Sequence, residues 1–358
     1  MRKRIACLLT AVLTMVACGG VGCSIVEKSG LQTNSEVVVC VPDGAPAMGL
    51  AALMRADTDG DGVTYKVVSP SVIATKVSAK NQEENADICA LPVTAASKLL
   101  GDGTRYKMLG VLTGGNLYLL SKDSGTIEDF AVGGVADLSH LVGKTVGVMK
   151  INEVPGLTFK CVLDGYGLPW QEVKNDGEKA EDKVNLKAIV DATAMDPLAQ
   201  DIACYVVAEP AASVQIQKNG FACVASLEDL YKQGVGGESV GYEGYPQAVL
   251  VAKTSLIEER SAWVEDFIAD VAQSALAVAT LSGEEIVSTV VGHLEDSAYT
   301  TTLKANVLTA DTVDRCGVRF AQSGVCKDAV QLYLTRLTAV DSAAAKMVAD
   351  SFFYGGNA

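Results

Sequence analysis

Histidine, paired cysteines and positive charge are scarce in this sequence. The 358 residues include two histidines, His140 and His293, and none of the ten cysteines stands in a CxxC pair. Zinc and thioredoxin-like sites are therefore disfavoured. P-loop, HExxH and GxGxxG motifs are missing as well, which disfavours the nucleotide-dependent and metal-dependent chemistry that those motifs serve. We expect no metal, no cofactor and no catalytic function.

The charge balance is acidic. The chain carries 29 Lys and Arg against 43 Asp and Glu, a formal net charge of −14. Proteins that bind nucleic acid present a basic surface, so nucleic acid is excluded as the expected partner. Apart from the N-terminus, no segment approaches the ~18 consecutive apolar residues of a transmembrane helix.

The N-terminus has the pattern of a bacterial lipoprotein signal. Three basic residues (2–4) precede an apolar run over 5–17, which ends in Met15-Val16-Ala17-Cys18. This predicts a signal peptide over 1–17 and a lipidated Cys18, with Cys23 as the weaker candidate. The alternatives are a secretory peptide cut near Ala17 or a retained anchor helix. We expect an extracytoplasmic protein, lipid-anchored to the bacterial cell membrane, with a flexible tether over 18–35.

The rest of the chain is too long for one hydrophobic core, so two lobes, each with its own core, are expected. Apolar strand patterns alternate with helix patterns, which favours parallel sheets flanked by helices. Strands are expected at 37–41, 65–68, 86–91, 145–149, 184–190, 202–208, 221–224 and 247–252. Helices are expected near 46–54, from Pro70, at 92–100, 138–141 and 156–165, from Pro197, at 210–219, and over most of the chain from 257 onward.

The cysteines leave two interpretations open. Export permits disulfides, and Cys204 with Cys223 or Cys316 with Cys326 are the candidate pairs. Free thiols on buried strands are the alternative, because several of these cysteines lie in apolar runs.

Ligands of parallel sheets bind beyond the carboxyl ends of the strands, where helix N-termini present free N–H groups. Five turns are therefore candidates, one of them at the expected crossing between lobes. Together with Tyr245, they supply the candidate ligand-binding residues Asp43, Gly44, Ala45, Pro92, Val93, Thr94, Gly115, Asn116, Lys150, Pro155, Gly156 and Glu209.

Several candidates have a structural alternative. Glu209 can cap a helix, form an ion pair across the lobes or accept a hydrogen bond from a ligand amine. Tyr245 and Trp170 can stack on a flat ligand or pack in the core. The stretch 57–62 copies the start of an EF-hand loop, but the twelfth position is Val68, so an acidic surface turn is expected.

In chain order, a series of segments resembles the sulfonate, nitrate and thiamin-pyrimidine branch of ABC transporter substrate-binding proteins. The segments are VPDGAP at 41–46, ADI at 86–88, LP at 91–92, LGV at 109–111, GNLY at 115–118, GKTVGV at 143–148, AEP at 208–210, GYPQA at 244–248, RCGVRF at 315–320 and FFY at 352–354.

The resemblance implies the two-lobed type II periplasmic-binding fold with a ligand cleft between the lobes. Lobe one would comprise 36–118 and 245–354, and lobe two 119–244. It also implies a small-molecule solute, hinge closure, and an ABC permease with its ATPase as partners. The related pyrimidine synthases use a cofactor lysine, a histidine and a cysteine-rich iron motif. This chain has two histidines and no such cysteine run, so the synthase activity is not expected.

The five turns contain no arginine, and Lys150 is their only basic residue. A strongly anionic solute is therefore disfavoured, because a guanidinium is its expected partner. A neutral or weakly charged organic solute is expected, with pyrimidine-like and sulfonate-like molecules as the classes that the resemblance implies. The alternatives are an exported enzyme using Asp43 and Glu209, or a ligand-sensing receptor on the same scaffold.

Overall fold

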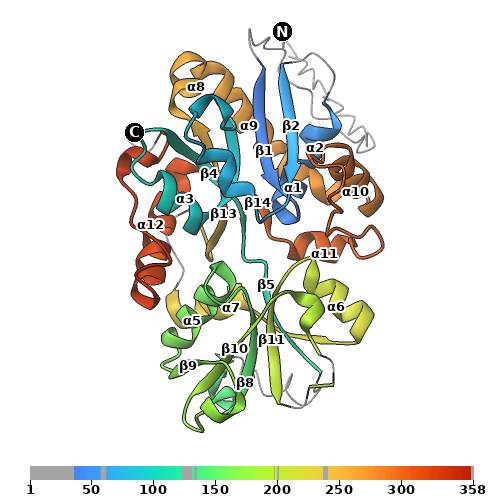
Figure 1. The fold of residues 1–358 in the computed structure, drawn as a ribbon, viewed down its shortest axis with the longest axis vertical. Coiled ribbons are helices and arrows are strands. Elements are labelled where there is room, and N and C mark those ends of the chain that lie inside the picture. The colour runs from blue at the N-terminus through green and yellow to red at the C-terminus, as the bar shows by residue number, and fades with distance from the viewer. Residues whose placement is uncertain are drawn as a thin grey trace, which may run out of the picture.

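The computed structural model of the chain describes residues 36–57, 62–122, 131–132, 135–196, 198–199, 201–236 and 241–355. The signal peptide, the lipidation candidates Cys18 and Cys23 and the tether lie outside these residues, as does most of the acidic turn at 57–62. Within them the chain forms two lobes stacked along the long axis of the molecule (Figure 1). No helix in the described ranges is long and apolar enough to cross a bilayer.

The sheet of lobe 1 has six strands in the order β14-β4-β13-β3-β1-β2. Strand β1 pairs in parallel with β2 and β3, whereas β13 pairs antiparallel with β3 and β4. Strands β1 to β4 therefore share one direction. The bounds are β1 (Val37–Pro42), β2 (Val63–Val68), β3 (Ile88–Pro92), β4 (Tyr106–Gly114), β13 (Pro246–Lys253) and β14 (Val318–Gln322).

The sheet of lobe 2 repeats this plan in the order β12-β5-β11-β8-β10-β9. Strands β8 to β11 share one direction, and β5 runs antiparallel to β11 and β12. A two-stranded ribbon, β6 with β7, is separate. The bounds are β5 (Leu117–Ser121), β6 (Ala131–Val132), β7 (Val135–Ala136), β8 (Thr145–Met149), β9 (Trp170–Val173), β10 (Val184–Ile189), β11 (Ile202–Ala208) and β12 (Ala222–Ser226).

Helices flank both sheets (Figure 1). The α-helices are α1 (Ala45–Gly49), α2 (Ala51–Arg55), α3 (Val93–Leu100), α5 (Val154–Gly165), α6 (Ala211–Asn219), α7 (Leu227–Tyr231), α8 (Thr254–Glu259), α9 (Ser261–Ala277), α10 (Gly283–Gly292), α11 (Ala310–Arg315) and α12 (Ser323–Val340). The short helices are η1 (Ile73–Val77), η2 (Gln82–Glu84), η3 (Ser139–Leu141), η4 (Asp176–Glu178), η5 (Ala192–Ala194), η6 (Lys232–Gly236, a π-helix), η7 (Val278–Thr280) and η8 (Asp350–Phe352).

Local sequence explains several helix ends. Ser282 and Glu285 form a capping box that starts α10, and such a box satisfies N–H groups that the first turn leaves free. Gly220 ends α6 in the left-handed conformation, with φ of 67°, which glycine adopts at no steric cost.

Three predicted helices are corrected. The segment 138–141 forms a single 3₁₀ turn, as does 73–77. Residues 198, 199 and 201, the described part of the helix predicted from Pro197, are not helical. The first two segments are only a few residues long, so they make too few hydrogen bonds to offset the cost of nucleating an α-helix.

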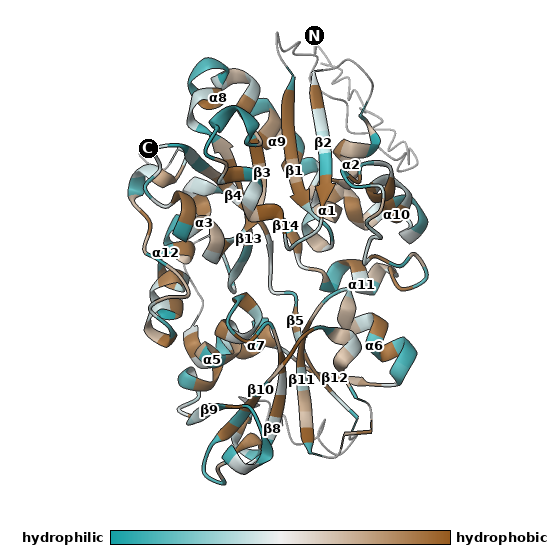
Figure 2. Cartoon of the chain, viewed as in Figure 1, coloured by the Kyte–Doolittle hydropathy of each residue, from teal (hydrophilic) through white to brown (hydrophobic). Residues whose placement is uncertain are grey.

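The expectation of two separate cores is wrong. One cluster of buried apolar side chains runs from lobe 1, through Tyr245 and Tyr333, into lobe 2. Each sheet also has a smaller cluster that is confined to its own lobe. Figure 2 shows hydrophobic strands under helices whose outer surfaces are more hydrophilic. The continuity arises because α12 contacts β4 of lobe 1 and also α5 of lobe 2.

The cysteines of the described ranges are free thiols, which removes the two candidate disulfides. Cys204 lies on β11 and Cys223 on β12, and β5 separates these strands. Cys223 is exposed, whereas Cys40, Cys89, Cys161, Cys204, Cys316 and Cys326 are buried. The alternative of free thiols, nearly all of them buried, is the one that the structure shows.

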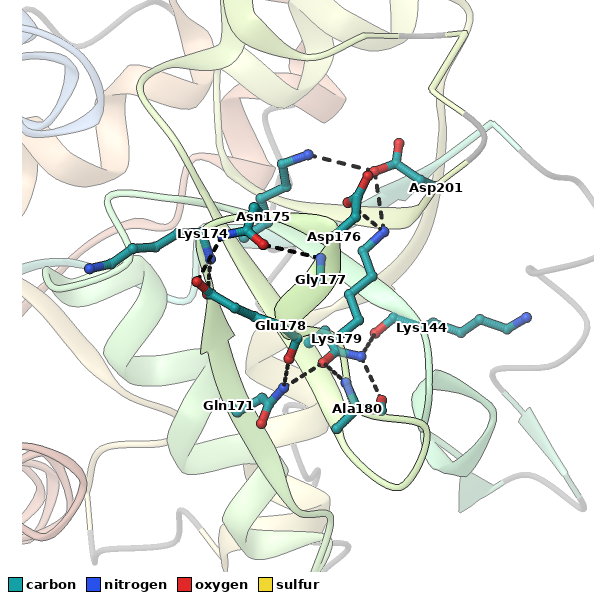
Figure 3. Close-up of polar contacts among 12 residues, drawn as sticks. Lys144, Gln171, Lys174, Asn175, Asp176, Gly177, Glu178, Lys179, Ala180 and Asp201 are labelled. Carbon is teal, nitrogen blue, oxygen red and sulfur yellow. Dashed lines mark hydrogen bonds and ion pairs between the residues drawn. The ribbon is translucent and has the colours of Figure 1, made fainter.

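The connection between β9 and β10 is tied by a polar cluster around the fully buried Asn185. Its Nδ2 donates to the Ala180 carbonyl at 2.9 Å, and its Oδ1 accepts from the Ala180 N–H at 2.9 Å. Gln171 Nε2 donates to the Glu178 carbonyl at 2.6 Å (Figure 3). The cluster lies at the amino ends of β8 and β10, on the edge of the sheet that faces away from lobe 1, so it fixes the scaffold rather than the candidate site.

Candidate functional site

The carboxyl ends of the parallel strands face each other between the lobes. Strand β4 runs with β1 to β3 and ends at Gly114, where the chain crosses into β5. In lobe 2, Ala208 at the end of β11 pairs with Leu117 at the start of β5. The Glu209 N–H donates to the Asn116 carbonyl at 2.9 Å. The topology therefore brings the turns that follow β1, β3, β8 and β11 to one junction.

The predicted residues are distributed over this junction. Asp43, Gly44 and Ala45 follow β1; Pro92, Val93 and Thr94 join β3 to α3; Gly115 and Asn116 form the first crossing; Lys150, Pro155 and Gly156 join β8 to α5; Glu209 follows β11; and Tyr245 precedes β13 at the second crossing.

Asp43 is buried and fully engaged inside lobe 1. Its carboxylate accepts from Thr301 Oγ1 at 2.6 Å, from the Thr302 N–H at 2.7 Å and from Thr302 Oγ1 at 2.8 Å. Tyr299 Oη donates to the same carboxylate at 3.1 Å. Burial, together with the Asp43 charge, raises the pKa of Tyr299 to about 12. Asp43 thus anchors the segment 299–302 to the end of β1.

Gly44 is the open position of this turn. Its φ is 105°, and a Cβ built there would meet nothing within 4 Å. No side chain caps the N-terminus of α1 that begins beside it. The backbone of this buried residue therefore borders open space.

Glu209 both caps a helix and forms an ion pair across the lobes. Its side chain is 1% exposed, and it accepts from the Ser213 N–H and Ser213 Oγ, each at 2.9 Å. Arg315 Nε of lobe 1 lies 2.9 Å from Glu209 Oε1. Two of the three predicted roles are therefore occupied by protein groups.

Further polar contacts continue this ion pair between α6 and α11. Arg315 Nη2 donates to Ser213 Oγ at 2.6 Å, and Ser213 Oγ lies 3.2 Å from Thr312 Oγ1. Gln217 Nε2 donates to the Asn306 carbonyl at 3.5 Å. We call this group of Glu209, Ser213, Gln217, Asn306, Thr312 and Arg315 the polar seam.

A second seam joins the lobes through tyrosines. Tyr245 stacks on Tyr333 with ring centroids 5.9 Å apart, and Tyr231 meets both rings edge-on. Tyr333 Oη of α12 lies 2.6 Å from Thr158 Oγ1 of α5. Burial raises the pKa of Tyr245 and of Tyr333 well above 10. We call Thr158, Tyr231, Tyr245 and Tyr333 the tyrosine seam.

The two aromatic candidates therefore pack against protein. Tyr245 is fully buried, and its Oη accepts from the Leu117 N–H at 3.2 Å. Trp170 lies on the edge strand β9, where Nε1 donates to Asp164 at 2.8 Å and Lys160 lies over the ring. For Trp170 the packing alternative is confirmed, since β9 is the outermost strand of its sheet.

Arginines do reach the junction, although the turns contain none. Arg315 ends α11 and Arg319 lies on β14, both from the C-terminal part of lobe 1. Arg319 donates to Glu228, whose carboxylate also fills the space that a Cβ on Gly115 or Gly244 would need. Both arginines belong to the segment 315–320 that carries part of the family resemblance. The sequence did not show that this segment lies beside the turns, because it arrives there only when the chain returns to lobe 1.

Lys150 and the first turn of α5 form the part of the junction that follows β8 in lobe 2. Lys150 has φ of 49° and pairs with Glu153 at 3.2 Å, with both side chains largely exposed. Pro155 and Gly156 are buried in the first turn of α5, and a Cβ on Gly156 would lie 2.1 Å from the Ile151 carbonyl oxygen. Glycine is required there because the turn is tight.

Two buried oxygen atoms near the first crossing have no protein partner. They are Thr113 Oγ1 and Asn116 Oδ1, among the residues that the structure describes. Buried polar atoms normally form a hydrogen bond. Thr94 is also buried, at the start of α3. These oxygens are suited to a solute with N–H or O–H donors.

Among the residues that the structure describes, Asp43 and Glu209 do not form a catalytic pair. Asp43 and Glu209 are both engaged in structural contacts. No cluster of three or more His, Cys, Asp or Glu side chains in the described ranges could hold a metal ion. The stretch 237–241 has GxSxG spacing, and its residues 237–240 lie outside the described ranges.

Comparison with known proteins was made by sequence and by structure. The sequence matches no protein-family model and no curated protein. Solved structures do match. An ABC transporter protein from Parabacteroides distasonis is 19% identical, with a TM-score of 0.65 over 90% of this chain and 99% of its own.

Two further matches are proteins named for the ligand that they bind. The periplasmic aliphatic sulphonate binding protein SsuA from Escherichia coli is 14% identical, with a TM-score of 0.60 over 88% of this chain and 96% of its own. The periplasmic nitrate-binding protein NrtA from Synechocystis PCC 6803 is 10% identical, with a TM-score of 0.53 over 86% of this chain and 82% of its own. The chain therefore has the two-lobed α/β fold of periplasmic binding proteins, as the sequence resemblance predicted.

Proposed function

We propose that this chain is the extracytoplasmic solute-binding component of an ABC importer of the sulfonate, nitrate and thiamin-pyrimidine branch. The observation that carries the proposal is the junction itself: two six-stranded, mainly parallel sheets, joined by two crossings, present the carboxyl ends of their parallel strands to each other. Ligands of open α/β sheets bind at such ends. The proposed lobes are 36–118 with 245–354, and 119–244, although β5 at 117–121 belongs to the second sheet.

The proposed solute is a neutral or weakly charged organic molecule that carries hydrogen-bond donors. Arg315, Arg319 and Lys150 each lie against a carboxylate, so their charges are already balanced. Thr113 and Asn116 offer oxygen acceptors at the first crossing. A pyrimidine-like solute fits this chemistry better than a sulfonate-like one, because a sulfonate brings a full negative charge to a junction where these three described cations are already paired.

A thermal-shift screen of the purified chain tests this proposal. Pyrimidines, sulfonates, amines and aromatic acids are compared, and one class should raise the melting temperature, since a solute at 100 times its Kd adds about 2.7 kcal/mol to stability. The variant Asn116→Ala should lose that shift, whereas Asn175→Ala, in the loop far from the junction, should keep it. Chemical conversion of the solute would contradict the proposal and favour an enzyme.

The proposed anchor is a diacylated Cys18, which would hold the protein at the outer face of the cell membrane. Replacement of Cys18 by Ser should move the protein from the membrane fraction to the soluble fraction, and Cys23→Ser should not. The reverse result would assign the lipid to Cys23. Delivery of the solute to a permease is the proposed next step, and genes for a permease and an ATPase beside this one would distinguish an importer from a sensor.

A further inference from the structure

The lobes are joined on two opposite sides by contacts of different kinds. Helices α6 and α11 lie on one side of the molecule, and α5 and α12 lie on the other (Figure 1). The first pair carries the polar seam and the second pair carries the tyrosine seam. The two crossings of the chain lie between them, with Glu228 against Gly115 and Gly244.

Water can reach several residues of the polar seam: Gln217 and Asn306 are exposed, and Arg315 is partly exposed. The Arg315 side chain is 33% exposed, whereas the Glu209 side chain is 1% exposed. Arg315 also lies over the Tyr118 ring, and its carbonyl accepts from Tyr118 Oη at 3.1 Å. If Arg315 leaves, water can solvate the guanidinium, and Glu209 keeps both bonds from Ser213. Separation of this side therefore exposes few groups that lack a partner.

The tyrosine seam is continuous with the largest buried apolar cluster. Arg336 of α12 reinforces it by donating to Tyr231 Oη at 2.8 Å and to the carbonyls of Val235 and Gly236, each at 2.7 Å. Separation of this side would bring large aromatic surfaces into water, which is strongly unfavourable.

We infer that Arg315 is a latch: the lobes open between α6 and α11 when Arg315 releases Glu209 and Ser213, while α5 and α12 stay packed. The entrance to the interlobe site is then on the α6–α11 side. The proposed function supplies the ligand that would enter there, but the direction of opening follows from the contacts alone. Glu228, Gly115 and Gly244 lie at the crossings, between the side that stays packed and the side that opens, so we assign the pivot to them.

Spin-label distances in the solute-free protein test the latch. The full chain is purified in detergent with Cys23 and Cys223 replaced by Ser. One label pair, at Lys218→Cys and Ala310→Cys, spans α6 and α11; the other, at Lys174→Cys and Ala339→Cys, spans lobe 2 and α12. All four label positions are exposed. Arg315→Met is compared with Arg336→Met, because both remove an arginine that joins the lobes.

We expect Arg315→Met to lengthen the α6–α11 distance several times more than the α12 distance, and Arg336→Met to leave the α6–α11 distance unchanged. An unchanged α6–α11 distance in Arg315→Met, or equal lengthening of both pairs, would overturn the latch. If Arg315→Met does not fold by circular dichroism, Ser213→Ala carries the same expectation. The distances are measured without solute, so this test is independent of the thermal-shift screen. The latch can be supported even if no solute is found, and a solute can be found even if the latch is refuted.

Discussion

The two seams make the same connection with different physics. The tyrosine seam buries aromatic rings in a cluster shared by both lobes, whereas the polar seam joins the lobes through one ion pair and a few hydrogen bonds. Apolar burial has no substitute in water, but an exposed arginine exchanges one set of hydrogen bonds for another. From this difference we infer that the tyrosine seam is a permanent interlobe contact and the polar seam a reversible one. The following substitutions test that difference, beginning with the largest expected effect.

Tyr333→Ala should be the most destabilising change. The residue is buried among Tyr231 and Tyr245 and donates to or accepts from Thr158. Removing such a ring from a core costs about 4 kcal/mol of unfolding free energy, measurable by urea denaturation. Tyr333→Phe, the control, loses only the hydroxyl contact and should cost about 1 kcal/mol. Equal costs would mean that the seam depends on the hydrogen bond rather than on apolar burial.

Gly115→Ala tests the pivot between the seams. Gly115 has φ of 66°, and a Cβ would lie 2.3 Å from the Glu228 carboxylate, so left-handed strain and a steric clash add to about 3 kcal/mol. Gly167 has φ of 67° with open space around it, and Gly167→Ala should cost about 1 kcal/mol from strain alone. Similar melting temperatures for the two variants would show that Glu228 moves away easily.

Glu209→Gln tests the polar seam and should have an intermediate effect. It leaves Arg315 without its buried partner, but that guanidinium can reach water, so we expect about 2 kcal/mol. A double-mutant cycle with Arg315→Met should show positive coupling. Glu153→Gln, in the exposed pair with Lys150, should change stability by less than about 0.5 kcal/mol. No coupling in the cycle would remove the energetic basis of the latch.

Alkaline pH should weaken the tyrosine seam gradually. Burial raises the pKa of Tyr245 in the folded protein well above its ordinary value of 10. The unfolded chain therefore loses this proton first, and the stability from Tyr245 is complete below pH 10 and declines as the pH rises. Each such tyrosine lowers stability by up to about 1.4 kcal/mol per pH unit above 10. Tyr245→Phe should decline less steeply than the wild type in urea unfolding at about pH 9 to about pH 11.

Much of the fold could be predicted because its signals are local. The β-branched run at 37–41 and the apolar run at 202–208 became β1 and β11, and the turns after them reached the junction as parallel topology requires. For Glu209 the sequence left three alternative roles open, because it does not show which group lies against the carboxylate. The arginines of the junction were missed for the same reason: Arg315 lies 106 positions from Glu209 in the chain, yet the two are in contact.

The sequence by itself determined the strand and helix alternation, the two-lobed plan and the turns that face between the lobes, since hydrophobic periodicity and glycine or proline positions are properties of short segments. Only the tertiary structure decided that α12 joins the two cores, that the seven thiols of the described ranges stay unpaired and that each guanidinium at the junction meets a carboxylate. Those outcomes depend on which distant segments the folded chain brings within a few ångströms. Burial and charge pairing act between such segments and leave no local pattern.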